Sequence, residues 1–340
     1  MKRNSSDIKR ITLIIGILFA LSVAHPRASG NIDDKTTAQI LIVKSSDSSF
    51  YAPTLKGFIS GLQRREQGNG ISIHFQTMAL TGEKRNDAHA LQERLKQKSR
   101  LIVTLGTDAT VMTASMHPSI PALFTLVLDP ISLGIAKSLD DPGGDFSGVT
   151  LLVNPGKQLE ILQEADPSVK RVGVLYTNDD PTSIAFLKQA DTAAKQLNLT
   201  LKTAAVNPSD QITSVLKQFD NQVDALWIIA DPSSTGANSL SATLAYARIH
   251  KLPVLGLSSA TVHAGALAAL SPNMEDLGDE TADMAVGILN GEQTPAVMRV
   301  RGPLRTLLCL NLDAARALSI KLPSEMLHLA DEVVDSSRTP

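Results

Sequence analysis

The chain has 340 residues, with 32 basic and 34 acidic side chains and a formal net charge of −2. This balance argues against binding to nucleic acid or to an anionic membrane, because both need a concentrated basic face. A single cysteine, Cys309, excludes an intramolecular disulfide, so packing alone must stabilise the fold. The length favours two domains of about 150 residues each. Small molecules and other proteins remain as partners.

The first thirty residues have the composition of an export signal. Basic residues lie within the first ten positions, an apolar run follows over residues 11–24, and small residues come next. This order predicts a signal peptide over residues 1–28, cleaved near Ala24 or Ala28, and a periplasmic product. A permanent membrane helix is the alternative, but it needs about 20 apolar residues. No cysteine lies near either cleavage position, so a lipid anchor is not expected.

Short, nearly continuous apolar runs recur along the rest of the chain. Runs of this kind are typical of parallel strands that helices cover on both faces. The predicted strands are residues 39–43, 101–105, 122–127, 172–176, 225–229, 254–257 and 266–270.

Amphipathic stretches with apolar residues three or four positions apart separate several of these runs. Leu55, Phe58 and Leu62 give one such stripe, and Leu277, Met284 and Ile288 give another. Alternating strands and helices predict an α/β fold with two lobes, each a mostly parallel sheet with helices on both faces.

The chain is expected to cross from one lobe to the other at two places. Turn-forming residues fill 140–145, and a new strand–helix series starts beyond Val149; a return is expected near 271–273. The predicted division is residues 36–147 plus about 272–300 for lobe 1, 148–271 for lobe 2, 301–334 as a C-terminal segment packing on the lobes, and 335–340 as a polar tail.

Polar loops follow most of the predicted strands. Ser46 lies in the loop after the first strand, and Ser258 lies in the loop after residues 254–257. Ligands of open α/β sheets bind outside the carboxyl ends of the strands, so these loops are predicted to line a polar pocket. The alternative is that their Ser, Thr and Asp side chains only cap the following helices.

Several short segments are recognisable by their order and spacing: 128–130, 142–149, 172–176, 265–268, 277–278 and 330–334. Through them, from about residue 39 to 334, the chain resembles the ABC transporter substrate-binding family that includes tryptophan and tyrosine transporter binding proteins. This resemblance implies a type I periplasmic binding protein fold, a clamshell that binds a small solute and presents it to a permease.

The resemblance also points to pocket residues. Thr182 stands where the aromatic amino-acid binders usually have Asn, and Pro232 replaces an Asn after Asp231. Both changes remove an amide that can donate and accept, which disfavours tryptophan or tyrosine as the ligand. The positions that the resemblance implies are Thr107, Asp129, Ser183 and Asp231, with Thr182 beside them.

Aromatic residues are few: one Trp, three Tyr and eight Phe. Trp227 lies within an apolar run, which is typical of a core residue. Tyr51, beside Phe50, is the better candidate for stacking on a ligand. The low aromatic content favours a small polar or zwitterionic ligand.

Sequence patterns of catalysis are weak. Ser258 follows a strand, but the second glycine of a nucleophile elbow is missing, and a base within reach of Ser258 would be needed for an enzyme. The seven histidines are scattered singly, so no metal or other cofactor is expected. We therefore expect a monomeric, non-enzymatic solute-binding protein that serves an ABC importer. A sensory binding protein that reports to a membrane receptor or histidine kinase is the alternative.

Overall fold

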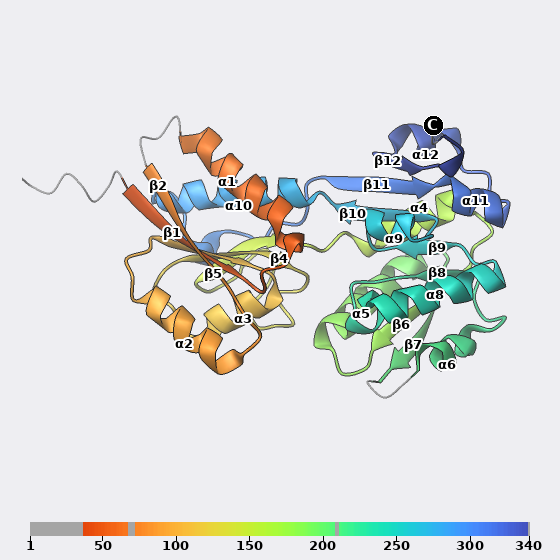
Figure 1. The fold of residues 1–340 in the computed structure, drawn as a ribbon, viewed down its shortest axis with the longest axis horizontal. Coiled ribbons are helices and arrows are strands. Elements are labelled where there is room, and N and C mark those ends of the chain that lie inside the picture. Colours follow the sequence, from red (N-terminus) through yellow and green to blue (C-terminus); the bar gives the residue numbers. More distant parts are fainter. Residues whose placement is uncertain (1–36, 67–71, 208–210, 339–340) are drawn as a thin grey trace, which may run out of the picture.

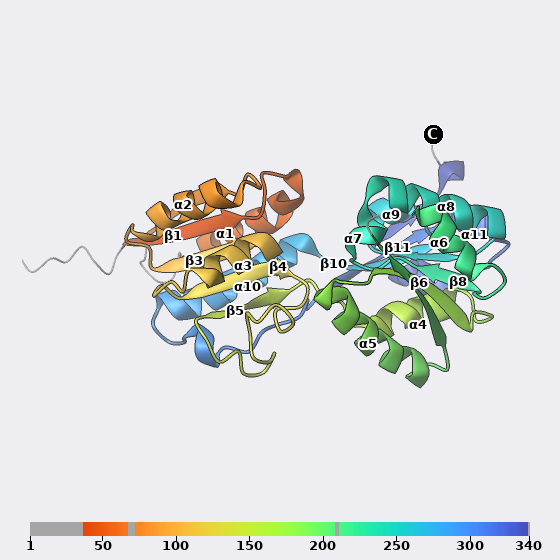
Figure 2. The same cartoon turned by 90° about the horizontal axis from the view of Figure 1, so that it is seen from below.

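The computed structural model describes residues 37–66, 72–207 and 211–338. Two α/β lobes lie side by side along the long axis of the molecule, and both views show them joined by a few crossing segments (Figures 1 and 2). The predicted signal peptide lies outside the described residues. None of the helices in these ranges combines the length and hydrophobicity that a membrane span requires.

Lobe 1 contains a five-stranded sheet in the order β2-β1-β3-β4-β5, and every neighbouring pair is parallel. β3 and β4 are buried along their whole length, as their unbroken apolar sequences predict. The strands are β1 (Thr37–Lys44), β2 (Ser72–Ala79), β3 (Leu101–Leu105), β4 (Ala122–Val127) and β5 (Phe146–Thr150).

Helices cover both faces of this sheet. Phe58 and Leu277 pack with the inward side chains of β1 and β3 on one face, and Leu91 and Ala109 pack on the other. The lobe 1 helices are α1 (Ala52–Glu66), α2 (Lys84–Leu95), α3 (Thr107–Ser115) and α10 (Met274–Leu289), with 3-10 turns at Ser49–Tyr51 and Pro295–Val297.

Lobe 2 contains a seven-stranded sheet in the order β12-β11-β10-β9-β8-β6-β7. All neighbouring pairs are parallel except β10 with β11. The strands are β6 (Arg171–Thr177), β7 (Thr200–Val206), β8 (Ala225–Trp227), β9 (Val254–Gly256), β10 (Ala268–Pro272), β11 (Thr306–Asn311) and β12 (Glu332–Val334).

The helices of lobe 2 also lie on both faces of their sheet. Trp227 is 2% exposed, packs with Phe186 in the core, and donates from its indole N–H to Gln158 Oε1 at 3.2 Å. Its core role is therefore confirmed. The helices are α4 (Pro155–Ala165), α5 (Pro181–Gln196), α6 (Ile212–Leu216), α7 (Pro232–Thr235), α8 (Ala237–His250), α9 (Ser259–His263), α11 (Leu312–Leu318) and α12 (Ser324–Leu329), with 3-10 turns at Lys217–Phe219 and Ser336–Arg338.

Asx side chains start several helices directly after a strand or a crossing. Asn154 accepts from the N–H groups of the first turn of α4, and Asn273 does the same for α10. Asp180 and Asp231 accept at the starts of α5 and α7, and a proline follows each of them at the first helical position. These caps satisfy N–H groups that have no partner within the helix.

The chain passes between the lobes three times; the second crossing lies where the sequence predicts it, and the other two differ from the predicted boundaries. β5 belongs to the sheet of lobe 1, so the first crossing lies after Thr150 rather than after residue 147. The second follows Pro272, the end of β10. Residues 301–305 form the third, because β11 and β12 are strands of lobe 2 and do not merely pack on the lobes as predicted. Ser147 and Gly148 interrupt the apolar pattern of β5, so hydrophobicity alone did not identify that strand.

Helices α1 and α10 approach so closely that their glycines are required. A Cβ on Gly278 would lie 2.0 Å from the carbonyl oxygen of Thr54, and one on Gly57 would lie 1.9 Å from that of Glu275. No side chain fits at these distances. This contact fixes α10, which enters from lobe 2, against lobe 1.

Candidate ligand-binding site

The carboxyl ends of β1, β3 and β4 lie at one edge of lobe 1, and their loops bring polar groups together there. Ser45 accepts a hydrogen bond on Oγ from the Ala109 N–H at 2.9 Å, which ties the β1 loop to the start of α3. Gly106, with φ +93°, makes this turn possible. A Cβ on Gly106 would lie 2.6 Å from Ser45 Oγ and 3.1 Å from the Tyr51 hydroxyl. The ring of Tyr51 therefore lies directly against this glycine.

Of the predicted lobe 1 residues, Ser46, Tyr51 and Thr107 share this edge. Ser46 is half-buried and accepts from the Ser48 N–H at 3.4 Å, while Thr107 is exposed at the first position of α3. Tyr51 meets Phe50 edge to face, with ring centroids 5.3 Å apart. Phe50, which is not among the site residues predicted from sequence, is 53% exposed.

Asp129 lies after β4, and its side chain stabilises the turn that follows it. Its Oδ1 accepts from the N–H of Ile131 at 3.0 Å and of Ser132 at 3.1 Å. The residue is half-buried, and within the described ranges Oδ2 receives no hydrogen bond. One carboxylate oxygen therefore has the capping role that sequence analysis had kept as an alternative, and the other is free to meet a ligand.

Asp231, one of the pocket positions that the resemblance implies, is buried. It is 1% exposed, and its carboxylate accepts from the Thr177 N–H at 2.8 Å, the Thr177 hydroxyl at 2.9 Å and the Ser233 N–H at 2.7 Å. Burial raises the pKa of Asp231, but hydrogen bonds from Ser183, Ser233 and Thr177 outweigh it and leave the pKa below its usual value. The side chain joins the loops after β6 and β8. The Asp-Pro pattern looked the same at Asp129 and Asp231, so sequence could not separate the two environments.

The other predicted residues of lobe 2 lie at the corresponding edge of its sheet. Ser183 is 1% exposed and its N–H donates to Asp180 at 2.9 Å, whereas Thr182 beside it is half-buried at the start of α5. Ser258, half-buried, donates its N–H to Thr261 Oγ1 at 3.1 Å. Thr182 and Ser258 are therefore the accessible members of this set.

A base next to Ser258 was the feature that would have favoured an enzyme. The nearby carboxylate, Glu332, instead bridges two other side chains: Ser259 Oγ donates to it, and His263 Nε2 lies 2.5 Å from its Oε1. In a catalytic triad the histidine stands between serine and carboxylate. Here the carboxylate stands between them, so this cluster lacks that geometry. Within the described ranges, no group of three His, Cys, Asp or Glu side chains is arranged to hold a metal ion.

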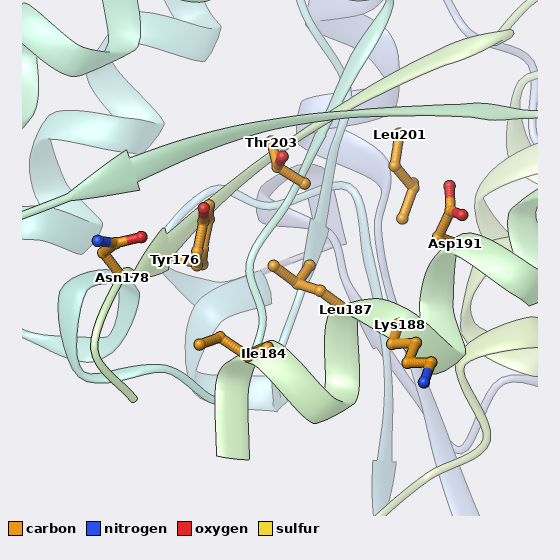
Figure 3. Close-up of a pocket in the computed structure, with 8 residues that line it drawn as sticks. All are labelled: Tyr176, Asn178, Ile184, Leu187, Lys188, Asp191, Leu201 and Thr203. Atoms are coloured by element: carbon orange, nitrogen blue, oxygen red, sulfur yellow. The ribbon is translucent and has the colours of Figure 1, made fainter. Parts of the chain in front are cut away.

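Two surface grooves lie on lobe 2. The groove in Figure 3 has a volume of about 420 Å³ and lies on lobe 2 between α5, β6 and β7, where Leu187 and Leu201 are among the residues that line it. A larger one of about 770 Å³ lies between α8, α9 and α11. Both grooves are lined by residues of lobe 2 alone, and neither contains Thr182 or Ser258.

Comparison with known proteins identifies the family of the chain. A family model described as ABC transporter substrate binding protein matches residues 40–334. The chain belongs to this family of ABC transporter substrate-binding proteins. The predicted family and the two-lobe α/β fold are thereby confirmed.

Relatives of this substrate-binding protein include a tyrosine-binding protein of Clostridioides difficile (strain R20291), 25% identical over 276 residues, which cover 78% of this chain and 76% of that protein. A Streptococcus pneumonia ABC domain in complex with L-Trp is 26% identical with a TM-score of 0.70, covering 87% of this chain and all of that one. The ligand-free, open structure of a substrate-binding protein with adhesive properties from Clostridium difficile is 25% identical with a TM-score of 0.75, covering 88% and 100%.

Proposed function

We propose that this substrate-binding protein is exported, captures an amino acid between its lobes as a monomer, and delivers it to the permease of an ABC importer. The observation that carries the proposal is the edge of lobe 1, where Tyr51, Gly106 and the start of α3 meet. Free helix N–H groups can bind the carboxylate of an amino acid, and an aromatic ring beside them can contact its side chain.

The start of α3 is suited to the ligand's carboxylate. Ser45 accepts from the Ala109 N–H, but no described residue accepts from the N–H of Thr107 or Asp108. Free N–H groups at a helix start, together with the helix dipole, stabilise an anion. Thr107 adds a hydroxyl at the same place, and Ser46 adds another from the β1 loop.

The ligand's ammonium group would meet Asp129. Its Oδ2 is available, whereas the carboxylate of Asp231 already accepts from its own loops. We therefore assign the charged contact to lobe 1 alone. From lobe 2, Thr182 and Ser258 would supply hydroxyl groups on closure.

An aromatic side chain on the ligand fits Phe50 and Tyr51 better than a small polar one does. Phe50 leaves an apolar ring half in water beside the proposed pocket, and aromatic pairs gain about 0.5–1.5 kcal/mol beyond simple burial. The names of the tyrosine-binding and L-Trp-bound relatives support the same class. The replacements at Thr182 and Pro232 argue for a contact pattern in lobe 2 unlike that of aromatic amino-acid binders.

A thermal-shift panel of the common amino acids tests the proposal. A true ligand at about 100 times its Kd stabilises the protein by about 2.7 kcal/mol. Stabilisation by L-tyrosine, L-tryptophan or L-phenylalanine, and none by L-serine or L-glutamate, is expected. Stabilisation only by small polar amino acids would contradict the aromatic ligand and favour the small polar ligand that the low aromatic content suggested. A panel without any response would contradict the proposal as a whole.

A further inference from the structure

The third crossing, residues 301–305, is held to both lobes. On the lobe 1 side, the Arg301 N–H donates to the Gly148 carbonyl and the Thr150 N–H donates to the Arg301 carbonyl, each at 2.9 Å. On the lobe 2 side, β11 begins at Thr306, which pairs with Pro272 of β10. Between the second and third crossings, the Asn273 N–H donates to the Arg305 carbonyl at 3.2 Å. The residues between these anchors must change position when the lobes rotate.

Glu280 contacts the crossing between its two anchors. Its Oε1 accepts from the Leu304 N–H at 2.9 Å, and the residue is only 6% exposed. Its Oε2 is buried and has no hydrogen-bond partner among the described residues. A buried carboxylate oxygen without a donor is costly, so this one calls for an explanation.

Charged groups surround Glu280 on α10 and on the crossing. Asp283 pairs with Arg301 at 2.8 Å, which places a cation near Glu280 without a direct bond to it. The remaining charges belong to pairs of their own: Asp279 with Arg64 and Arg65 of α1, Asp276 with Arg305 at 3.8 Å, and Arg305 with Asp331 at 3.6 Å.

These surroundings disfavour the ionised form of Glu280. Burial is the largest cause and raises the pKa of its carboxyl group; Asp276 and Asp279 raise it further, while the Leu304 N–H and Arg301 oppose the shift. The net direction is upward.

We propose that Glu280 is a positioning residue of the hinge and makes the equilibrium between open and closed lobes depend on pH. The proposal rests on the lobe closure that the proposed function requires. Closure moves Leu304 relative to α10, because the crossing is anchored to both lobes. Movement of this segment opens the contact that buries Glu280 and gives its Oε2 access to water.

The direction of the effect follows from proton linkage. Glu280 binds a proton more tightly where its charge is buried without a partner than where Oε2 is satisfied. Acid therefore favours the open arrangement, and closure becomes easier as the pH rises through the pKa of Glu280. A binding protein with this residue releases its ligand more readily in acid.

Single-molecule energy transfer between dyes on the two lobes tests this without any ligand. Lys84→Cys on lobe 1 and Lys217→Cys on lobe 2 give exposed labelling positions, while Cys309 is buried. Between about pH 8 and about pH 4, a range that covers the ordinary glutamate pKa of about 4.3 and the region above it, the closed fraction of the wild-type protein should fall several-fold. Glu280→Gln should abolish this pH dependence.

Glu275→Gln is the matched control, since Glu275 lies on the same helix in an exposed ion pair with Lys56 at 3.1 Å. It should keep the wild-type response. If Glu280→Gln fails to fold, Glu280→Asp keeps a titrating carboxyl group, and a changed midpoint of the response supports the proposal. An unresponsive wild-type protein, an unchanged response in Glu280→Gln, or an unchanged midpoint in Glu280→Asp would each overturn it. Failure of every amino acid to close the lobes in a parallel measurement would instead count against the proposed function.

Discussion

Replacing Asp231 by alanine distinguishes a structural carboxylate from a ligand contact. Asp231 is 1% exposed and accepts hydrogen bonds from both the N–H and the hydroxyl of Thr177 and of Ser233. Each buried donor left without a partner costs about 1–3 kcal/mol. Since at least the two N–H groups lose their acceptor, Asp231→Ala should lower the free energy of unfolding by about 2–5 kcal/mol.

The pH dependence of this loss gives a second readout. The pKa of Asp231 is lowered in the folded protein, where hydrogen bonds outweigh the opposite effect of burial. Its contribution to stability is thus present above the unfolded pKa of about 3.9 and is lost as the pH falls through the lower folded pKa. The difference between wild type and Asp231→Ala should shrink in that acidic range.

Urea denaturation at several pH values measures both quantities. Asp179→Ala is the matched control, because Asp179 is exposed in the loop after β6. It should change stability by less than about 0.5 kcal/mol. If Asp231→Ala unfolds like the wild type but binds ligand weakly, the carboxylate faces the ligand and our interpretation of its burial is wrong.

The remaining predictions concern packing, ligand contact and thiol reactivity. Gly278→Ala should destabilise lobe 1 by about 1–3 kcal/mol in thermal unfolding, because its Cβ would overlap the Thr54 carbonyl. Gly287→Ala on the same helix, where the nearest atom is 3.5 Å away, should be neutral or stabilising. Equal effects of the two substitutions would contradict the close contact. Tyr51→Ala should weaken amino-acid binding about tenfold in calorimetry and Tyr51→Phe much less. An equal loss in both variants would show that the hydroxyl, not the ring, is the contact. Burial raises the pKa of the Cys309 thiol to about 11, so the native protein should react slowly with a thiol reagent at neutral pH and quickly in urea; rapid native labelling would refute its burial.

The central strands could be predicted because their sequences carry a strong pattern. β3 and β4 are unbroken apolar runs, and the structure buries every residue in them. β2 and β7 lie at sheet edges, where side chains such as His74 and Lys202 interrupt the apolar pattern. Edge strands are half-solvated, so hydrophobicity alone does not identify them.

The loops that carry the site could be located from sequence, but the direction of each side chain could not. Asp129 and Asp231 both follow an apolar run and precede proline, yet Asp231 is buried in a hydrogen-bond network that Thr177, 54 residues away, completes. Ser45 and Ser46 are adjacent in one polar loop, and only the fold shows that Ser45 bonds to α3. Such choices depend on contacts between distant segments.

The claim that an amino acid closes two separate half-sites is tested most directly by small-angle scattering of the protein with and without the amino acid that gives the largest thermal shift. The account predicts a smaller radius of gyration at saturation, and no such change in a Tyr51→Ala, Asp129→Asn double variant at the same ligand concentration. A radius of gyration that stays the same at proven saturation of the wild-type protein would contradict closure around the ligand.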